Sequence, residues 1–171
     1  MKTSATFLIT ATTVLVSLAF GLPATAQAGC KHSADPIRSI SKKNARSAIG
    51  CLFNDRRSSA NVKRRGDIEK AAQNHSATMA RQWCLSHQCP GEANLKVRVE
   101  RTGYLRGASG YELGEVVLSG PAKSSARDVV SRWMNSSGHR AVIMKSSYDH
   151  AGVGLSIRSG VVFATGDFGH R

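Results

Sequence analysis

The first 28 residues constrain this chain most, because they have the pattern of an export signal and not of a folded domain. A positive charge at Lys2 precedes an apolar run from Phe7 to Phe20, and the triplet Ala26-Gln27-Ala28 follows. This order of charged, apolar and small-residue regions is typical of a secretory signal peptide. The apolar run has about 14 residues, whereas a membrane-spanning helix needs roughly 20. We therefore predict a secreted, extracellular protein that is cleaved after Ala28.

The cysteines all follow that signal. An even number of cysteines in an oxidising compartment predicts two disulfides, and sequence proximity favours pairing each cysteine with its neighbour in the chain. A zinc site that includes His87 is an alternative, but its Cys-x4-Cys spacing is unusual. Lipidation of Cys30 is a second alternative. The expected pairs are Cys30–Cys51 and Cys84–Cys89.

Positive charge is concentrated early in the exported part. The formal net charge of the chain is +13, and residues 31–65 hold ten Lys or Arg against two Asp. Such a flank predicts non-specific attraction to an anionic cell-envelope polymer or to lipid headgroups, unless it is an ordinary solvated surface. No aromatic residue interleaves with the basic run 56–65, so specific nucleic-acid binding is not expected. The basic residues concerned are Lys42, Lys43, Arg46, Arg56, Arg57, Lys63, Arg64 and Arg65.

Hydrophobic periodicity predicts an α+β domain over residues 44–171, preceded by a basic segment at 29–43. Helices first and strands late favour this class over a doubly wound sheet. A loop is expected over residues 58–66, and a Ser159-Gly160 turn is typical of a hairpin. The expected helices cover 44–57, a segment that opens with Asp67 as its N-cap, 95–102 and 124–134, and the expected strands cover 112–118, 152–157 and 161–168.

Some residues on the helical stripes are predicted to be structural. His75 falls on the apolar face of its helix, so we expect a core histidine that is hydrogen-bonded to the backbone and is not a ligand. Trp83 and Trp133 are expected to anchor the core. Asn54 and Arg57, three residues apart on the first helix, are expected to hold that helix to the sheet.

Polar residues outside these stripes gather in three places: Ser86-His87, Glu112 to Glu115, and Ser137 to Arg140. Two imidazoles and a carboxylate can ligate a divalent metal such as Zn2+ or hold a polar ligand, and His with Glu can act in acid/base catalysis. Ser86 and Ser137 each lie close to a histidine in sequence, which leaves a Ser-His-Glu hydrolase open. Ser137 is equally typical of a turn that ends a helix.

A series of short motifs lies in order between Cys51 and Phe168. Their order and spacing are similar to the CAP superfamily, or SCP domains, which includes cysteine-rich secretory, antigen 5 and plant pathogenesis-related proteins and many secreted bacterial proteins. Residues 133–140 are close to the bacterial W-M-N-S-P-G-H-R motif. The motifs are Leu52 to Arg57, Ala71 to Ala80, Ser86-His87, Arg98 with Gly103-Tyr104, Gly114-Glu115, Trp133 to Arg140, Gly152-Val153-Gly154, and Asp167-Phe168-Gly169.

This resemblance implies a three-layer α-β-α sandwich with a cleft lined by two histidines and by glutamate. The matching positions are His87, Glu115 and His139, with the two histidines as metal ligands and Glu115 as a possible third. The segment that carries the second family glutamate is missing between Trp133 and His139. Glu112 does not replace it, because an offset of three along a strand points to the opposite face from Glu115.

Two departures from the family pattern concern the cleft. Val116 and Val142 stand where an asparagine is usual, which predicts a less preorganised cleft. Arg98 and Arg140 are expected to be buried against carboxylates such as Asp167. The function that the resemblance implies best is an extracellular binding module; a secreted peptidase-like hydrolase that uses the same cleft, and adhesion through the basic N-terminal third, are the alternatives.

Overall fold

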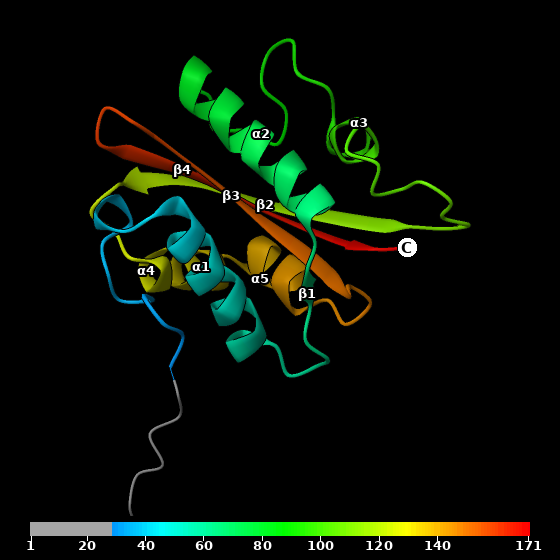
Figure 1. The fold of residues 1–171 in the computed structure, drawn as a ribbon, viewed down its shortest axis with the longest axis horizontal. Coiled ribbons are helices and arrows are strands. Elements are labelled where there is room, and N and C mark those ends of the chain that lie inside the picture. The colour runs from blue at the N-terminus through cyan, green and yellow to red at the C-terminus, as the bar shows by residue number, and fades with distance from the viewer. Residues whose placement is uncertain (1–28) are drawn as a thin grey trace, which may run out of the picture.

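The structure, a computed structural model, describes residues 29–171, so the predicted signal peptide lies outside the described residues. Its centre is a four-stranded sheet with the strand order β1-β3-β4-β2 (Figure 1). β1 pairs with β3 in parallel, and the other neighbours are antiparallel. β2 therefore lies at one edge of the sheet. The strands are β1 (Lys63–Arg64), β2 (Glu112–Pro121), β3 (His150–Arg158) and β4 (Val161–His170).

Helices cover both faces of the sheet, which confirms the predicted α+β class and the three-layer α-β-α arrangement. α2 (Gly66–Gln82) and α3 (Leu95–Glu100) lie on one face (Figure 1). The opposite face carries α1 (Lys42–Arg56), α4 (Ala126–Asn135) and α5 (Ser137–Met144). A short 3-10 helix, η1 (Ile37–Ser39), precedes α1. None of the helices in residues 29–171 has the length and apolar content needed to cross a membrane.

Local sequence signals account for several element ends. The Ser125 side chain accepts a hydrogen bond from the Asp128 backbone N–H while the Asp128 carboxylate accepts one from the Ser125 N–H, a capping box that starts α4. Ser159 and Gly160, with φ of 46° and 76°, form the predicted hairpin turn between β3 and β4. The expected N-cap at Asp67 is wrong. Asp67 lies inside the first turn of α2, where its carboxylate pairs with Arg65 at 2.7 Å and complements the helix dipole.

Besides η1, two elements lie where the sequence predicted none. β1 lies inside the expected loop 58–66, and α5 follows α4 after a single residue, Ser136. Ser137 therefore opens a helix and does not end one, and this helix carries His139.

The main core fills the space between the sheet and α1, α4 and α5. Trp133 is fully buried there, as predicted, with its ring centroid 5.8 Å from that of Phe53. The prediction that Trp83 anchors the core is wrong, because its side chain is 51% exposed. Trp83 takes a left-handed conformation (φ 54°) at the end of α2, which turns its ring out of the helical stripe and under the Arg158 guanidinium.

Both predicted disulfides are confirmed, so neither cysteine pair is available to zinc. Cys30–Cys51 has a Cα–Cα distance of 5.7 Å, and Cys84–Cys89 has one of 6.0 Å. The first joins the N-terminal segment to α1, and that segment also places Ile37 in the core.

Most arginines of the basic flank are engaged within the protein. Arg57 is buried and donates to the backbone carbonyls of Ile143, Lys145 and Tyr148. Asn54, one turn earlier, exchanges two hydrogen bonds with the backbone of Val62. These two side chains therefore fix the loops that enter β1 and β3. Ion pairs hold Arg46 and Arg64 to Glu69, and Arg65 to Asp67.

Candidate functional site

The candidate site lies at the β2 edge of the sheet, where Glu115 occupies the fourth residue of the strand. Its side chain is only 2% exposed and points toward the α2 and α3 side. Glu112 lies on the opposite face, as the strand offset predicted, and bonds to Lys145 and Ser147 after α5. Glu112 therefore contributes nothing to the surroundings of Glu115.

His87 is the exposed partner of Glu115. Its Nδ1 lies 2.8 Å from Oε1 of Glu115, and its side chain is 60% exposed. Because Nδ1 is engaged by the carboxylate, Nε2 is the nitrogen left to meet a ligand. The Cys84–Cys89 disulfide closes the short loop that carries this histidine.

Arg98 pairs with the second carboxylate oxygen of Glu115. This arginine is buried on α3 and pairs with Oε2 of Glu115, while it also donates to the backbone carbonyls of His87, at 2.8 Å, and Ala93, at 3.2 Å. Arg98 is therefore buried against a carboxylate, as expected, but its direct partner is Glu115 and not Asp167. Arg98 fixes both the loop of His87 and the carboxylate that orients its ring.

The two partners shift each other's protonation. The hydrogen bond that the His87 ring donates to the Glu115 carboxylate raises the pKa of His87 above its usual value. Burial alone would raise the pKa of Glu115, but the His87 hydrogen bond and the Arg98 charge outweigh it, so the pKa of Glu115 is lowered. The pair is therefore ionised more readily than two isolated groups.

Asp167 lies on β4, directly across from Glu115 on β2, and its pKa is shifted in the opposite direction. Complete burial, followed by the repulsion of Glu115, raises the pKa of Asp167 well above its usual value. Its two oxygens have no donor while the group is ionised. In its protonated form the carboxyl can donate to Glu115, so Asp167 is a neutral neighbour of the ion pair.

His75 lies under this network and is fully buried on α2. Its Nε2 lies 3.0 Å from the Ser86 carbonyl oxygen, which agrees with the predicted backbone bond. Its Nδ1 lies 2.9 Å from Glu92, a carboxylate that the sequence analysis missed. Glu92 sits in an irregular loop, where no periodicity signals it.

His139 reaches the site from α5, on the other face of the sheet. It is half-buried, and burial together with the charge of His87 lowers its pKa. No hydrogen bond or ion pair within residues 29–171 joins His139 to His87 or Glu115, so the charge of His87 is the link between the two imidazoles. Within residues 29–171, no three His, Cys, Asp or Glu side chains are placed to hold a metal ion. Glu115 already serves His87 and Arg98, which leaves the two histidines as candidate ligands.

The remaining predicted residues lie outside the immediate site. Val116 is fully buried in the main core, so its side chain does not form a wall of the site. Val142 packs at the margin of the same core. The prediction that Arg140 is buried against a carboxylate is wrong: it is exposed and donates to the backbone carbonyl of Met134 at the end of α4. The Ser86 hydroxyl accepts a bond from the Gln88 backbone N–H.

An α-β-α sandwich with a His–Glu pair at the edge of its sheet has the architecture of a CAP-type domain. The model of the Cysteine-rich secretory protein family, CAP, matches residues 52–168, and the chain belongs to this family. A comparison with curated protein sequences found no match.

Solved structures with the same fold come from bacterial extracellular or surface proteins. An extracellular SCP-domain protein of Bacillus anthracis has a TM-score of 0.62 and 21% identity over 77% of this chain and 44% of its own. An outer surface protein of Borrelia burgdorferi has a TM-score of 0.66 and 16% identity over 77% and 96% of the two chains. A cysteine-rich secretory protein of Staphylococcus aureus has 0.52 and 17% over 75% and 39%. The chain thus spans less than half the length of the first and third of these proteins.

Proposed function

We propose that this protein is a secreted binding module that holds a divalent metal ion between Nε2 of His87 and the imidazole of His139. The observation that carries the proposal is the hydrogen bond between Nδ1 of His87 and Glu115. Metal-binding histidines commonly donate their other ring N–H to a carboxylate, which fixes the ring and increases its basicity.

The donor set also limits the kind of metal site. Two imidazoles suit Zn2+ and its neighbours among the transition metals, and water or a bound ligand would fill the other positions. Glu115 orients the His87 ring and does not bind the ion itself, because its two oxygens pair with His87 and Arg98. Such a site exposes the ion to external ligands and binds it less tightly than a closed four-ligand site does.

Export of this module is supported by three features. The signal-like N-terminus precedes all four cysteines, the cysteines form two disulfides, and the fold is found in extracellular and surface proteins of bacteria.

Calorimetric titration with Zn2+ tests the metal site. We expect binding heat for the purified protein, and its loss in both His87→Ala and His139→Ala. The control is His32→Ala, which removes a histidine that pairs with Asp35 in the N-terminal segment. If the protein gives no heat, or if the control variant loses as much heat as the other two, the proposed metal site is wrong.

A hydrolase that uses the same residues is the second candidate, because a histidine oriented by a buried glutamate is also the arrangement of a general base. A Ser-His-Glu relay needs a hydroxyl within reach of the imidazole. Cleavage in peptide and peptidoglycan libraries that disappears in both His87→Ala and His139→Ala would support this candidate, and the absence of such cleavage would remove it.

Adhesion to an anionic envelope surface is the third candidate. The ion pairs of Arg46, Arg64 and Arg65 reduce the free charge of the basic flank. Lys42, Lys43 and Lys63, by contrast, are exposed and have no ion pair within the described part of the chain. Retention on heparin at about 0.15 M salt should fall when all three are changed to glutamine. Unchanged retention would contradict this role.

A further inference from the structure

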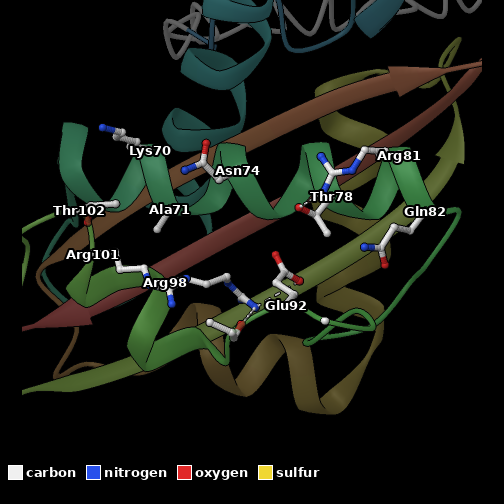
Figure 2. A pocket seen from close by; sticks show the side chains of 12 residues that line it. Lys70, Ala71, Asn74, Thr78, Arg81, Gln82, Glu92, Arg98, Arg101 and Thr102 are labelled. Carbon is white, nitrogen blue, oxygen red and sulfur yellow. Dashed lines mark hydrogen bonds and ion pairs between the residues drawn. The ribbon is translucent and has the colours of Figure 1, made fainter.

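A hollow of about 320 Å³ lies between α2 and α3, away from the metal site proposed above. Figure 2 shows Asn74, Thr78 and Gln82 spaced along α2, with Arg98 and Arg101 across the hollow and Glu92 between them. Neither His87 nor His139 lines it. The hollow is therefore a separate candidate binding site of the same domain.

Three cationic side chains line the hollow with little internal compensation. Lys70 and Arg81 come from α2 and Arg101 follows α3, and all three are exposed. The Arg81 guanidinium donates to the Thr78 hydroxyl at 3.2 Å, but none of the three forms an ion pair within residues 29–171. They differ in this from Arg46, Arg64 and Arg65 of the basic flank, each of which forms an ion pair.

The carboxylate that lines the hollow already has partners within the protein. Glu92 lies 2.9 Å from the His75 ring, accepts from the Cys89 backbone N–H at 3.2 Å and lies 3.7 Å from Arg98. Its side chain is only 10% exposed. The field at the mouth of the hollow is consequently positive, which favours an anionic ligand.

The uncharged lining restricts the ligand further. Hydroxyl and amide groups of Thr78, Asn74 and Gln82 can donate to or accept from hydroxyl groups. No aromatic or long aliphatic side chain lines the hollow, so it offers no surface for stacking a base or burying an acyl chain. A ligand that combines an anionic group with several hydroxyls fits both observations.

We propose that this hollow binds a phosphate or sulfate ester of a sugar or polyol. Lys70, Arg81 and Arg101 contact the tetrahedral oxyanion through charge-assisted hydrogen bonds. The amides and hydroxyl on α2 bind the hydroxyl groups of the ligand.

Backbone amide NMR of the purified protein tests this site with three probes: glucose 6-phosphate, glucose 6-sulfate and glucose. We expect saturable shifts in α2 and α3 with the two esters, and no saturable shift with glucose at the same concentrations. Absence of shifts with both esters, or equal shifts with glucose, would overturn the proposal.

Charge-neutralising variants separate this site from general electrostatic attraction. The double variant Lys70→Gln/Arg101→Gln should weaken ester binding about tenfold or more, and Arg81→Gln should weaken it too. Lys43→Gln, which removes an exposed charge on α1 across the sheet, is the matched control and should leave the affinity within about twofold. Equal losses in the control and the double variant would refute a specific site.

The proposals of a metal site and of an ester site can be refuted independently of each other. Ester binding should persist in His87→Ala and in the presence of a chelator, because neither His87 nor a metal is needed in the hollow. Loss of ester binding in both tests, with Lys70→Gln/Arg101→Gln unaffected, would place the ester at the histidines and overturn the inference.

Discussion

Nδ1 of His87 lies 2.8 Å from Oε1 of Glu115, so a buried carboxylate on β2 fixes an exposed imidazole on a loop closed by a disulfide. The same carboxylate is held from its other side by Arg98, whose guanidinium also binds the backbone carbonyl of His87. The ring and its loop are thus fixed together. An imidazole held in this way presents Nε2 in one direction, which a ligand-binding site requires.

Replacing Glu115 with glutamine should lower the pKa of His87 toward its ordinary value of 6.5. The hydrogen bond to the carboxylate is the largest cause of the raised pKa, and an amide cannot provide the same charge. NMR titration of the histidine ring signals measures the change. His150 on β3 contacts Asp149 and Tyr104 and not Glu115, so its titration should not move and serves as the internal control. An unchanged pKa of His87 in Glu115→Gln would contradict the role given to this pair.

Glu115→Gln should also change how the stability of the protein depends on pH. Breaking the buried pair with Arg98 should cost about 3 kcal/mol of the free energy of unfolding, because it leaves the buried guanidinium with only its longer, 3.7 Å contact to Glu92. The folded pKa of His87 is raised, so its contribution is fully present below pH 6.5 and is lost as the pH rises through the folded pKa. The difference between the original protein and Glu115→Gln should therefore be larger at pH 5.5 than at pH 8.5. Urea unfolding at the two pH values checks this, and a difference that grows with pH would refute it.

Asp167 should respond in the opposite way to its neighbour Glu115. Because the folded pKa of Asp167 is raised, the protein loses stability as the pH rises from about 3.8 through that folded pKa. Asp167→Asn replaces a neutral carboxyl with a neutral amide of the same shape, so it should remove this loss and unfold no more easily than the original protein at pH 7. Chemical unfolding of both proteins at pH 5 and pH 7 measures the effect. A loss as large as that of Glu115→Gln would show that Asp167 is ionised in the folded protein.

The sequence predicted the large elements because they contain long apolar patterns. α1 follows the 3.6-residue stripe that begins at Ala45. β3 and β4 are buried on both faces, so they follow from their apolar runs on either side of the Ser159-Gly160 turn and not from an alternating pattern. α5 buries only Ile143, and β1 has two residues, so neither leaves a detectable period. Trp83 matched the stripe of α2 by spacing, but a left-handed residue ends that helix and turns the ring outward.

The site was predictable only in part. His87, Glu115 and His139 came from motifs similar to those of a known family. Arg98 was expected to be buried against a carboxylate, but its partner is Glu115 and not Asp167. No local pattern indicates that Glu92 joins the network. Those contacts depend on how α3 and an irregular loop pack against β2 and α2. To decide whether Glu115 is a third metal ligand, it is also necessary to know that both of its oxygens are already engaged by His87 and Arg98.

The close contact of α2 with β3 leads to a prediction about two glycines. A Cβ at Gly154 would collide with the backbone of Ala72, and one at Gly152 with the backbone of Glu69. Neither collision is relieved by rotating a side chain, so Gly154→Ala should destabilise the fold by at least about 2 kcal/mol. Gly66→Ala, on α2 itself, is the control, because a Cβ at Gly66 meets nothing within 4 Å. Its effect on the midpoint of urea unfolding should be small, and equal losses in both variants would contradict the packing argument.

Removing either disulfide should lower the stability of the fold, but only removal of Cys84–Cys89 should change the geometry of the site. Cys30–Cys51 joins residues 21 apart and Cys84–Cys89 joins residues 5 apart. In the chain-entropy description, replacing both cysteines with serine should cost about 3 kcal/mol for the first pair and about 2 kcal/mol for the second. Only the second variant frees the loop of His87, so only it should lower the pKa of His87 toward 6.5 and weaken Zn2+ binding. Urea unfolding, ring NMR titration and calorimetry on the two variants measure these effects. If Cys30→Ser/Cys51→Ser also shifts His87, the ring is held by the whole fold, and the local loop does not control it.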